Sequence, residues 1–277
     1  MVKILAIGDF HGKFPSKLKR EAKKVDLIIA LGDFANADKI RKLIFKNWTN
    51  KKWYEAIGIR KARQLEKESF DSGLKVIKEL NALGKSVYII WGNTDFYKEY
   101  ATSEPPIIMP GFYNENIKTL KNINLFNRKK ISINNIDLIG HGGYVDVTEF
   151  IKHPLDKNLK NQKKRLKRYK RDEGKLKRLF KKYKHINNFI LGIHYAPLNI
   201  FDKVIYPGSP MNGKHVGWQP YNDVIAKYKP KLVLCGHMHE YQGKKKFGKS
   251  LVVNPGAAFQ GKAAIIDWPS LKVRFIK

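Results

Sequence analysis

Short apolar runs rich in β-branched residues occur along the whole chain, and each ends at glycine or at polar residues. Such runs lie at 2–8, 26–31, 86–91, 189–193 and 232–235. An apolar run of this length with turn residues at its end is typical of a strand that is buried on both faces. We therefore expect these five segments to form the interior of the fold.

Three further pairs of short segments flank tight turns and predict β-hairpins. Asn134 and Asn135 form the first turn, and asparagine tolerates the positive φ angles that such turns require. The other two turns are built from Gly-Lys and Pro-Ser pairs. The predicted hairpins join 130–133 to 136–140, 243–247 to 250–254, and 263–268 to 271–276.

The stretch 37–83, between the second and third predicted strands, carries apolar residues at helical spacing. Gly84 follows it, and glycine commonly ends a helix. Strand, helix and strand in this order predict parallel pairing of the two strands with a crossover helix between them. The aromatic residues of the stretch are interpreted as helix packing, with a base-stacking platform as the alternative; they are Trp48, Trp53 and Tyr54.

A second helical segment, from Lys157 to His185, is unusually basic. It contains 15 Lys or Arg residues and two acidic residues, which gives a net charge of +13. Its apolar residues recur at steps of three, four and seven, so one stripe of the helix is apolar and can dock on the rest of the protein. Gly174 is a point at which the segment can divide into two helices.

Together these elements predict two sheets with helices outside them, an α/β sandwich formed by residues 1–277 as a single domain. The basic segment would then be a helical insertion at about 155–186. The apolar content of 43% is that of a globular protein. No run approaches the ~20 apolar residues needed to cross a bilayer, and the first run lacks the features of a signal peptide. The single cysteine, Cys235, fits a reducing cytoplasm.

The formal net charge of +31 is the most unusual property of the composition. A field of this sign attracts polyanions such as nucleic acid, ribosomes or anionic lipid headgroups. A lysine-rich surface that only reflects the composition of the host's proteins is the alternative, because charge does not specify a partner.

Polar side chains able to bind metal follow five of the predicted strands. Ligands of open α/β sheets gather at the carboxyl ends of strands, so we expect these side chains to meet. Each motif alone is typical of a turn or a helix cap, whereas the set together predicts a metal site. The motifs supply Asp9 and His11, Asp33, Asn93 and Asp95, His194, and finally His237 and His239.

This ordered set resembles the signature of the calcineurin-like metallophosphoesterase superfamily. The stretches 234–240 and 254–256 are also similar to those of small prokaryotic and archaeal phosphohydrolases of that superfamily. The resemblance implies a four-layer α-β-β-α sandwich and a centre with two metal ions. It places Asp9, His11 and His239 on one ion and Asn93, His194 and His237 on the other, with Asp33 bridging both.

Imidazole, carboxylate and amide donors suit manganese first, with iron, zinc or nickel as alternatives, and suit calcium poorly. Two divalent ions about 3.5–4 Å apart stabilise both the attacking and the leaving oxygen of a phosphoryl displacement. The resemblance implies a metal-bridging hydroxide as the nucleophile. Asp95 is predicted to orient a ligand histidine by accepting its second N–H.

One position departs from the family pattern. Many members carry a histidine directly after the motif asparagine, where it can steady the phosphate or protonate the leaving group. This chain has Thr94 there. Either leaving-group protonation is less necessary, as for good leaving groups and many diesters, or another residue serves. His141, in a glycine-rich turn, and His215 are the candidates for that catalytic role, and the alternative for each is a surface histidine.

The resulting hypothesis is a metal-dependent phosphodiesterase that acts on nucleotides, cyclic nucleotides or RNA ends. A phosphomonoesterase, including a protein phosphatase, is the alternative within enzymes. A nuclease fits less well, because the chain lacks the extra length of a DNA-capping domain. A scaffold that has lost catalysis is disfavoured by the complete ligand set. A nucleic-acid-binding protein whose basic helix is its main functional element is the remaining alternative.

Overall fold

The computed structural model describes residues 1–47, 52–98, 111–151 and 159–277. Within them, the first of two six-stranded mixed sheets has the order β12-β11-β1-β2-β3-β4. Strands β1 to β4 are parallel to one another, and β11 and β12 add an antiparallel hairpin at one edge. Its strands are β1 (Val2–Ile7), β2 (Leu27–Ala30), β3 (Ser86–Ile89), β4 (Ile123–Leu125), β11 (Ala263–Trp268) and β12 (Lys272–Ile276).

The second sheet has the order β5-β6-β7-β8-β10-β9, with four parallel strands at its centre and an antiparallel strand at each edge. The predicted hairpins are therefore confirmed. Its strands are β5 (Lys130–Ile133), β6 (Ile136–His141), β7 (Ile190–Ile193), β8 (Leu232–Leu234), β9 (Gly243–Phe247) and β10 (Ser250–Asn254).

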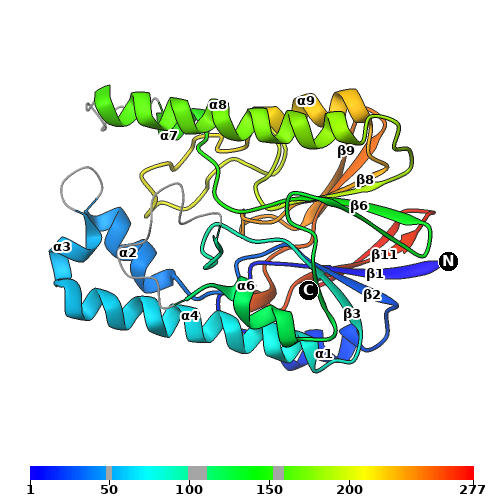
Figure 1. Cartoon of the computed structure of the whole chain (residues 1–277), viewed down its shortest axis with the longest axis horizontal. Coiled ribbons are helices and arrows are strands. Elements are labelled where there is room, and N and C mark those ends of the chain that lie inside the picture. Colours follow the sequence, from blue (N-terminus) through cyan, green and yellow to red (C-terminus); the bar gives the residue numbers. More distant parts are fainter. Residues whose placement is uncertain (48–51, 99–110, 152–158) are drawn as a thin grey trace.

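Helices cover the outer faces of both sheets (Figure 1). The helices α1 (Ser16–Ala22), α4 (Ile59–Asn81) and α6 (Tyr113–Asn116) lie on the first sheet. The helices α8 (Leu159–Lys182) and α9 (Gln219–Tyr228) lie on the second, and α7 (Thr148–Ile151) lies beside α8. The remaining described helices are α2 (Asp38–Lys46) and α3 (Trp53–Ile57), with the 3₁₀ turns η1 (Ile117–Thr119) and η2 (Ala258–Gln260).

Three apolar cores separate the four layers. Side chains alternate along β1, so that Leu5 and Ile7 pack against α1 and α4 while Ile4 and Ala6 pack between the two sheets. The third core lies between the second sheet and helices α8 and α9. The predicted four-layer α-β-β-α arrangement is confirmed, and burial on both faces explains why the strands are continuous apolar runs.

The basic segment forms α8, which docks through its C-terminal half. Leu176 and Phe180 are buried in the core over the second sheet, whereas Leu166 is 41% exposed. The helix runs through Gly174 without a break. Glycine costs a helix only about 1 kcal/mol relative to alanine, and the packing that follows it offsets this cost.

The predicted helical stretch 37–83 contains α2, α3 and α4, while Trp48 lies outside the described residues. Helices α2 and α3 stand at the end of the sandwich toward which β1 runs (Figure 1). Among the helices that the structure describes, none has the length and apolar composition of a membrane span.

Candidate metal centre

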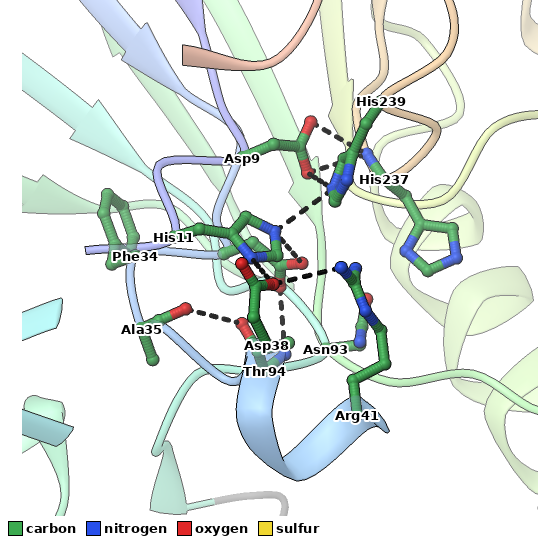
Figure 2. A network of polar contacts seen from close by, with 12 residues as sticks. Asp9, His11, Phe34, Ala35, Asp38, Arg41, Asn93, Thr94, His237 and His239 are labelled. Carbon is green, nitrogen blue, oxygen red and sulfur yellow. Dashed lines mark hydrogen bonds and ion pairs between the residues drawn. The ribbon is translucent and has the colours of Figure 1, made fainter. Parts of the chain in front are cut away.

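Seven predicted ligand residues follow five strand ends and converge at one end of the two sheets. Figure 2 labels Asp9, His11, Asn93, His237 and His239 among them. The first sheet supplies four of them, after β1, β2 and β3. The second sheet supplies three, after β7 and β8. Because the strands in question are the parallel ones of each sheet, their carboxyl ends point the same way, as the sequence predicts.

The turns that carry these ligands are locally strained. Four ligand residues have left-handed backbone conformations: Asp9 (φ 55°), His11 (φ 44°), Asp33 (φ 53°) and His237 (φ 69°). A non-glycine residue in this region costs roughly 1–2 kcal/mol. Such strain persists only where the surrounding structure fixes it, and it is concentrated at functional sites.

Two of the turns touch one another through glycine. A Cβ added at Gly32 would lie 2.1 Å from the backbone nitrogen of Gly92, and a Cβ at Gly92 would lie 2.1 Å from the Asp33 carboxylate. Only glycine permits this approach, because any side chain would meet the backbone or the carboxylate of the other turn. The contact brings the residues that follow the two glycines, Asp33 and Asn93, into one site.

Asp95 fastens the same two turns, which differs from its predicted role. One carboxylate oxygen accepts the backbone N–H groups of Phe34 (2.7 Å) and Ala35 (3.2 Å). The other accepts those of Asp33 (2.9 Å) and Gly92 (2.7 Å). The carboxylate thus serves backbone amides and no described histidine. Burial, followed by the charge of Asp33, raises the pKa of Asp95 to about 7.

One group of potential ligand atoms, all within 4.8 Å of one another, comes from Asp9, His11, Asp33 and His239. His11 Nδ1 lies 2.9 Å from a carboxylate oxygen of Asp38, so this nitrogen carries the proton. Its Nε2 therefore presents a lone pair, 3.1 Å from Nε2 of His239 and 3.7 Å from Asp33. Several electron-pair donors directed at one point are what a cation requires.

A second group comes from Asp33, His194 and His237. His194 Nδ1 donates to the Leu31 carbonyl at 2.8 Å, so its Nε2 also presents a lone pair. That lone pair faces the side-chain oxygen of Asn93 at 2.9 Å and Asp33 at 3.4 Å. An acceptor facing acceptors is unfavourable without a cation between them, so the donor set fits a metal.

The two groups suit a dinuclear divalent metal site, and Asp33 belongs to both of them. Burial, followed by the charge of His194, lowers the pKa of His237 well below its usual value. The neutral ring is the form that binds a metal. The backbone N–H of His237 donates to both oxygens of Asp9, at 3.0 and 3.1 Å, which fixes that carboxylate beside the first group.

Sequence reasoning missed two residues on α2, Asp38 and Arg41. One oxygen of Asp38 lies 2.9 Å from His11 Nδ1 and 3.1 Å from a guanidinium nitrogen of Arg41. The hydrogen bond from His11 lowers the pKa of Asp38 to about 2, against the opposing effect of burial. A carboxylate on the far nitrogen of a ligand histidine orients the ring. The only signal in the sequence is the Asp-x-x-Arg spacing shortly after Asp33.

The structure does not bring the two additional predicted catalytic histidines to this cluster. His141 is 1% exposed, lies 2.9 Å from the Tyr221 hydroxyl and stacks on Trp218 beneath α9. His215 is more exposed and its Nδ1 pairs with Asp202 at 2.7 Å. Neither lines the cavity that borders the cluster.

That cavity has a volume of about 860 Å³ and opens beside Asn93, Thr94, His237 and His239. Trp53 of α3, for which helix packing was predicted with a base-stacking platform as the alternative, also lines it. Three arginines also line it: Arg41, Arg165 and Arg168. Its apolar lining is Ile40, Ile44, Phe45, Trp53, Phe96, Tyr144, Tyr195, Val204, Tyr206, Met211, Val216, Met238 and Phe259.

Comparison with known proteins places this geometry in a family. The uncharacterized protein MJ1162 of Methanocaldococcus jannaschii is 24% identical over 259 residues, which cover 92% of this chain and 88% of the relative. The crystal structure of TT1561 of Thermus thermophilus is 15% identical, with a TM-score of 0.55 over 99% of this chain and 97% of that chain.

A dimetal phosphatase from Danio rerio is 11% identical, with a TM-score of 0.52 over 95% of this chain and 91% of that chain. At these identities the likeness to the solved structures shows a shared fold. The family model described as "Metallophosphoesterase, calcineurin superfamily" matches residues 1–277. The chain belongs to the calcineurin superfamily of metallophosphoesterases.

Proposed function

We propose that the protein is a metal-dependent phosphodiesterase with two divalent ions, manganese being favoured. Asp9, His11 and His239 would hold one ion, and Asp33 would contact both. The second ion would be held by Asn93, His194 and His237. The observation that carries this assignment is the convergence of imidazole nitrogens on carboxylate and amide oxygens in two adjoining groups.

When bound, the ions supply Lewis acidity toward phosphate oxygens and a water of lowered pKa. The chain's own residues hold this arrangement rigid. Asp38 and the Leu31 carbonyl fix the tautomers of two ligand histidines. The backbone N–H of Thr94 donates to Asp33 at 2.9 Å and so orients the shared carboxylate. The Tyr195 ring stacks on that of His237 with centroids 4.0 Å apart.

Two features favour a diester over a monoester. The Thr94 hydroxyl donates to the Ala35 carbonyl at 3.4 Å, and its short side chain cannot protonate a poor leaving group as imidazole can. The adjoining cavity of about 860 Å³ is far larger than a phosphate group and is mostly apolar. It has room for the organic group that a diester carries on each side of phosphorus.

The test is a matrix of substrates and metals on chelator-treated protein. Bis(p-nitrophenyl) phosphate, p-nitrophenyl phosphate, cyclic nucleotides and short RNA are each incubated with manganese, nickel, zinc or magnesium. We expect manganese to restore diester hydrolysis above monoester hydrolysis. Faster monoester turnover would favour the phosphomonoesterase or protein phosphatase alternative. No hydrolysis with any metal would refute the proposal.

A specific observation also supports binding of nucleic acid beside this site. Lys163, Lys167 and Lys170 follow one another along α8 at helical spacing, and all three are exposed. We call them the α8 lysine row. Arg165 and Arg168 of the same helix instead line the cavity. The row lies on a different face of α8 from these two arginines, so a polyanion held on it would bind the outer side of the helix that borders the cavity, and RNA is the substrate that we favour among polyanions.

We also propose a cytoplasmic location. Cys235 is a free thiol that is buried at the end of β8. The chain therefore forms no internal disulfide, which supports a location in a reducing compartment.

A further inference from the structure

Thr94 borders the cavity beside the predicted ligands but supplies no charged group to it. The Thr94 backbone N–H is engaged by Asp33 and its hydroxyl by the Ala35 carbonyl. Both contacts hold turns together and place no charge in the cavity. A phosphate bound between the cluster and the cavity would therefore need another side chain to contact its outer oxygens.

Arg41 stands where such a contact is possible. Its side chain extends from α2 toward the cluster of predicted metal ligands, on the side of Asn93 and His237 (Figure 2). It lines the same cavity as these two residues, together with Thr94 and His239. The neighbouring Lys42 of the same helix is exposed and does not line the cavity.

The guanidinium is held in place by the carboxylate that also orients a ligand. A single oxygen of Asp38 lies 3.1 Å from Arg41 and 2.9 Å from His11. The arginine and aspartate side chains are 41% and 39% exposed, so the pair sits at the cavity wall rather than in the core. A guanidinium has five N–H donors in a planar fork, and one contact with Asp38 leaves donors for a ligand.

The charges around Arg41 also indicate that its ligand is an anion. Arginine stays charged at any physiological pH, and here it faces a cluster built to bind two divalent cations. Cations facing one another repel unless an anion lies between them. Asp38 offsets one charge, and a tetrahedral oxyanion that touches both the metal centre and the guanidinium would offset the rest. Planar guanidinium groups match phosphate oxygens in a bidentate manner.

We propose that Arg41 is a catalytic residue that donates hydrogen bonds to the non-bridging oxygens of the substrate's phosphoryl group. The inference rests on the proposed function. In the hydrolysis, a water oxygen forms a bond to phosphorus and the ester P–O bond breaks. The leaving oxygen keeps the electron pair and takes a proton from solvent, while the attacking water releases one. Arg41 transfers no proton and stabilises the charge on the outer oxygens.

The experiment compares Arg41→Ala, Arg41→Lys and the control Lys42→Ala in the metal-loaded protein. Three quantities are measured: kcat and KM for bis(p-nitrophenyl) phosphate, the Kd of inorganic phosphate by calorimetry, and bound metal by elemental analysis. We expect Arg41→Ala to lower kcat/KM and phosphate affinity by about 10- to 150-fold, the factor that corresponds to lost hydrogen bonds to a charged group. The metal content should stay at that of the parent protein.

The charge-retaining Arg41→Lys variant should recover part of the loss, and free guanidinium ion should rescue Arg41→Ala. Lys42→Ala should match the parent. Activity and phosphate affinity of Arg41→Ala within twofold of the parent would overturn the proposal, and so would a loss explained by missing metal. If the parent hydrolyses no ester, the proposed function fails. The phosphate affinities of the parent and of Arg41→Ala then still decide whether Arg41 binds a phosphoryl group.

Discussion

Replacing Gly32 with alanine tests whether the close contact of two turns builds the metal centre. The added Cβ would lie 2.1 Å from the Gly92 nitrogen and 2.5 Å from the Trp91 carbonyl carbon, both of them backbone atoms that cannot rotate away. The position also has a φ of 89°, which L-residues rarely adopt. Two costs therefore add at this site, one from backbone conformation and one from overlap.

The chain offers a matched control for the first cost. Gly84, after α4, has a φ of 67°, and within the described part of the chain its Cβ would meet nothing closer than 4 Å. The conformational cost of alanine at positive φ is roughly 1–2 kcal/mol. Overpacking adds about 1–3 kcal/mol. We therefore expect a loss in the free energy of unfolding of roughly 2–5 kcal/mol for Gly32→Ala and 1–2 kcal/mol for Gly84→Ala.

The assay is urea unfolding of the metal-free proteins, so that metal binding does not add to the measured stability. A second measurement titrates manganese into each folded variant. The clash should displace Asp33 and Asn93, so Gly32→Ala should bind manganese more weakly, whereas Gly84→Ala should bind it like the parent. Equal destabilisation of the two variants, or parental metal affinity in Gly32→Ala, would refute the reasoning.

Three further predictions concern the ligands, the substrate and the basic helix. Asp33→Asn should lose bound metal, seen by elemental analysis, and lose diester hydrolysis, because the amide carries no charge to share between two ions; a folded variant with full metal and parental rate would contradict the assignment. Thr94→His should raise the rate on p-nitrophenyl phosphate relative to the diester, because imidazole can protonate the leaving group; an unchanged ratio would count against this role. Charge reversal of the α8 lysine row to glutamate should weaken RNA binding and reduce the slope of log K against log salt by about 2. Equal effects from reversing three exposed lysines on β9 would show that only net charge matters; these are Lys244, Lys245 and Lys246.

The sheets could be predicted because their signals are local. The predicted segments 130–133, 243–247, 250–254 and 263–268 match the observed strands residue for residue. Each lies next to a turn sequence, and 250–254 and 263–268 are also apolar runs, whereas 243–247 has three lysines between Gly243 and Phe247. Strand β4 was missed, since it has three residues and its pairing with β3 is decided by the sheet rather than by its own sequence.

The convergence of the predicted ligand residues followed from motif order, but the supporting contacts did not. Asp38 and Arg41 reach the ligand cluster only because α2 crosses the end of the first sheet. The position of α2 depends on tertiary packing and is not encoded in its local sequence pattern. The position of His141 was predictable in principle. Along β6, Ile136 and Leu138 face the other sheet, whereas Ile139 faces the core under helices α8 and α9. Because side chains alternate along a strand, His141 lies on the same face as Ile139.

The backbone of the predicted metal-binding turns is more strained than that of the sheets. Favourable interactions elsewhere in the fold must offset this conformational cost. Four ligands in left-handed conformations cost on the order of 4–8 kcal/mol together, comparable to the roughly 5–15 kcal/mol of net stability of a typical protein. The strained turns are held between buried strands of both sheets and by the four backbone amides that bind the Asp95 carboxylate. Because both sheets contribute ligands, the ligands can meet only after the two sheets have packed together. The rigidity of the sandwich is therefore what keeps these side chains directed at one another.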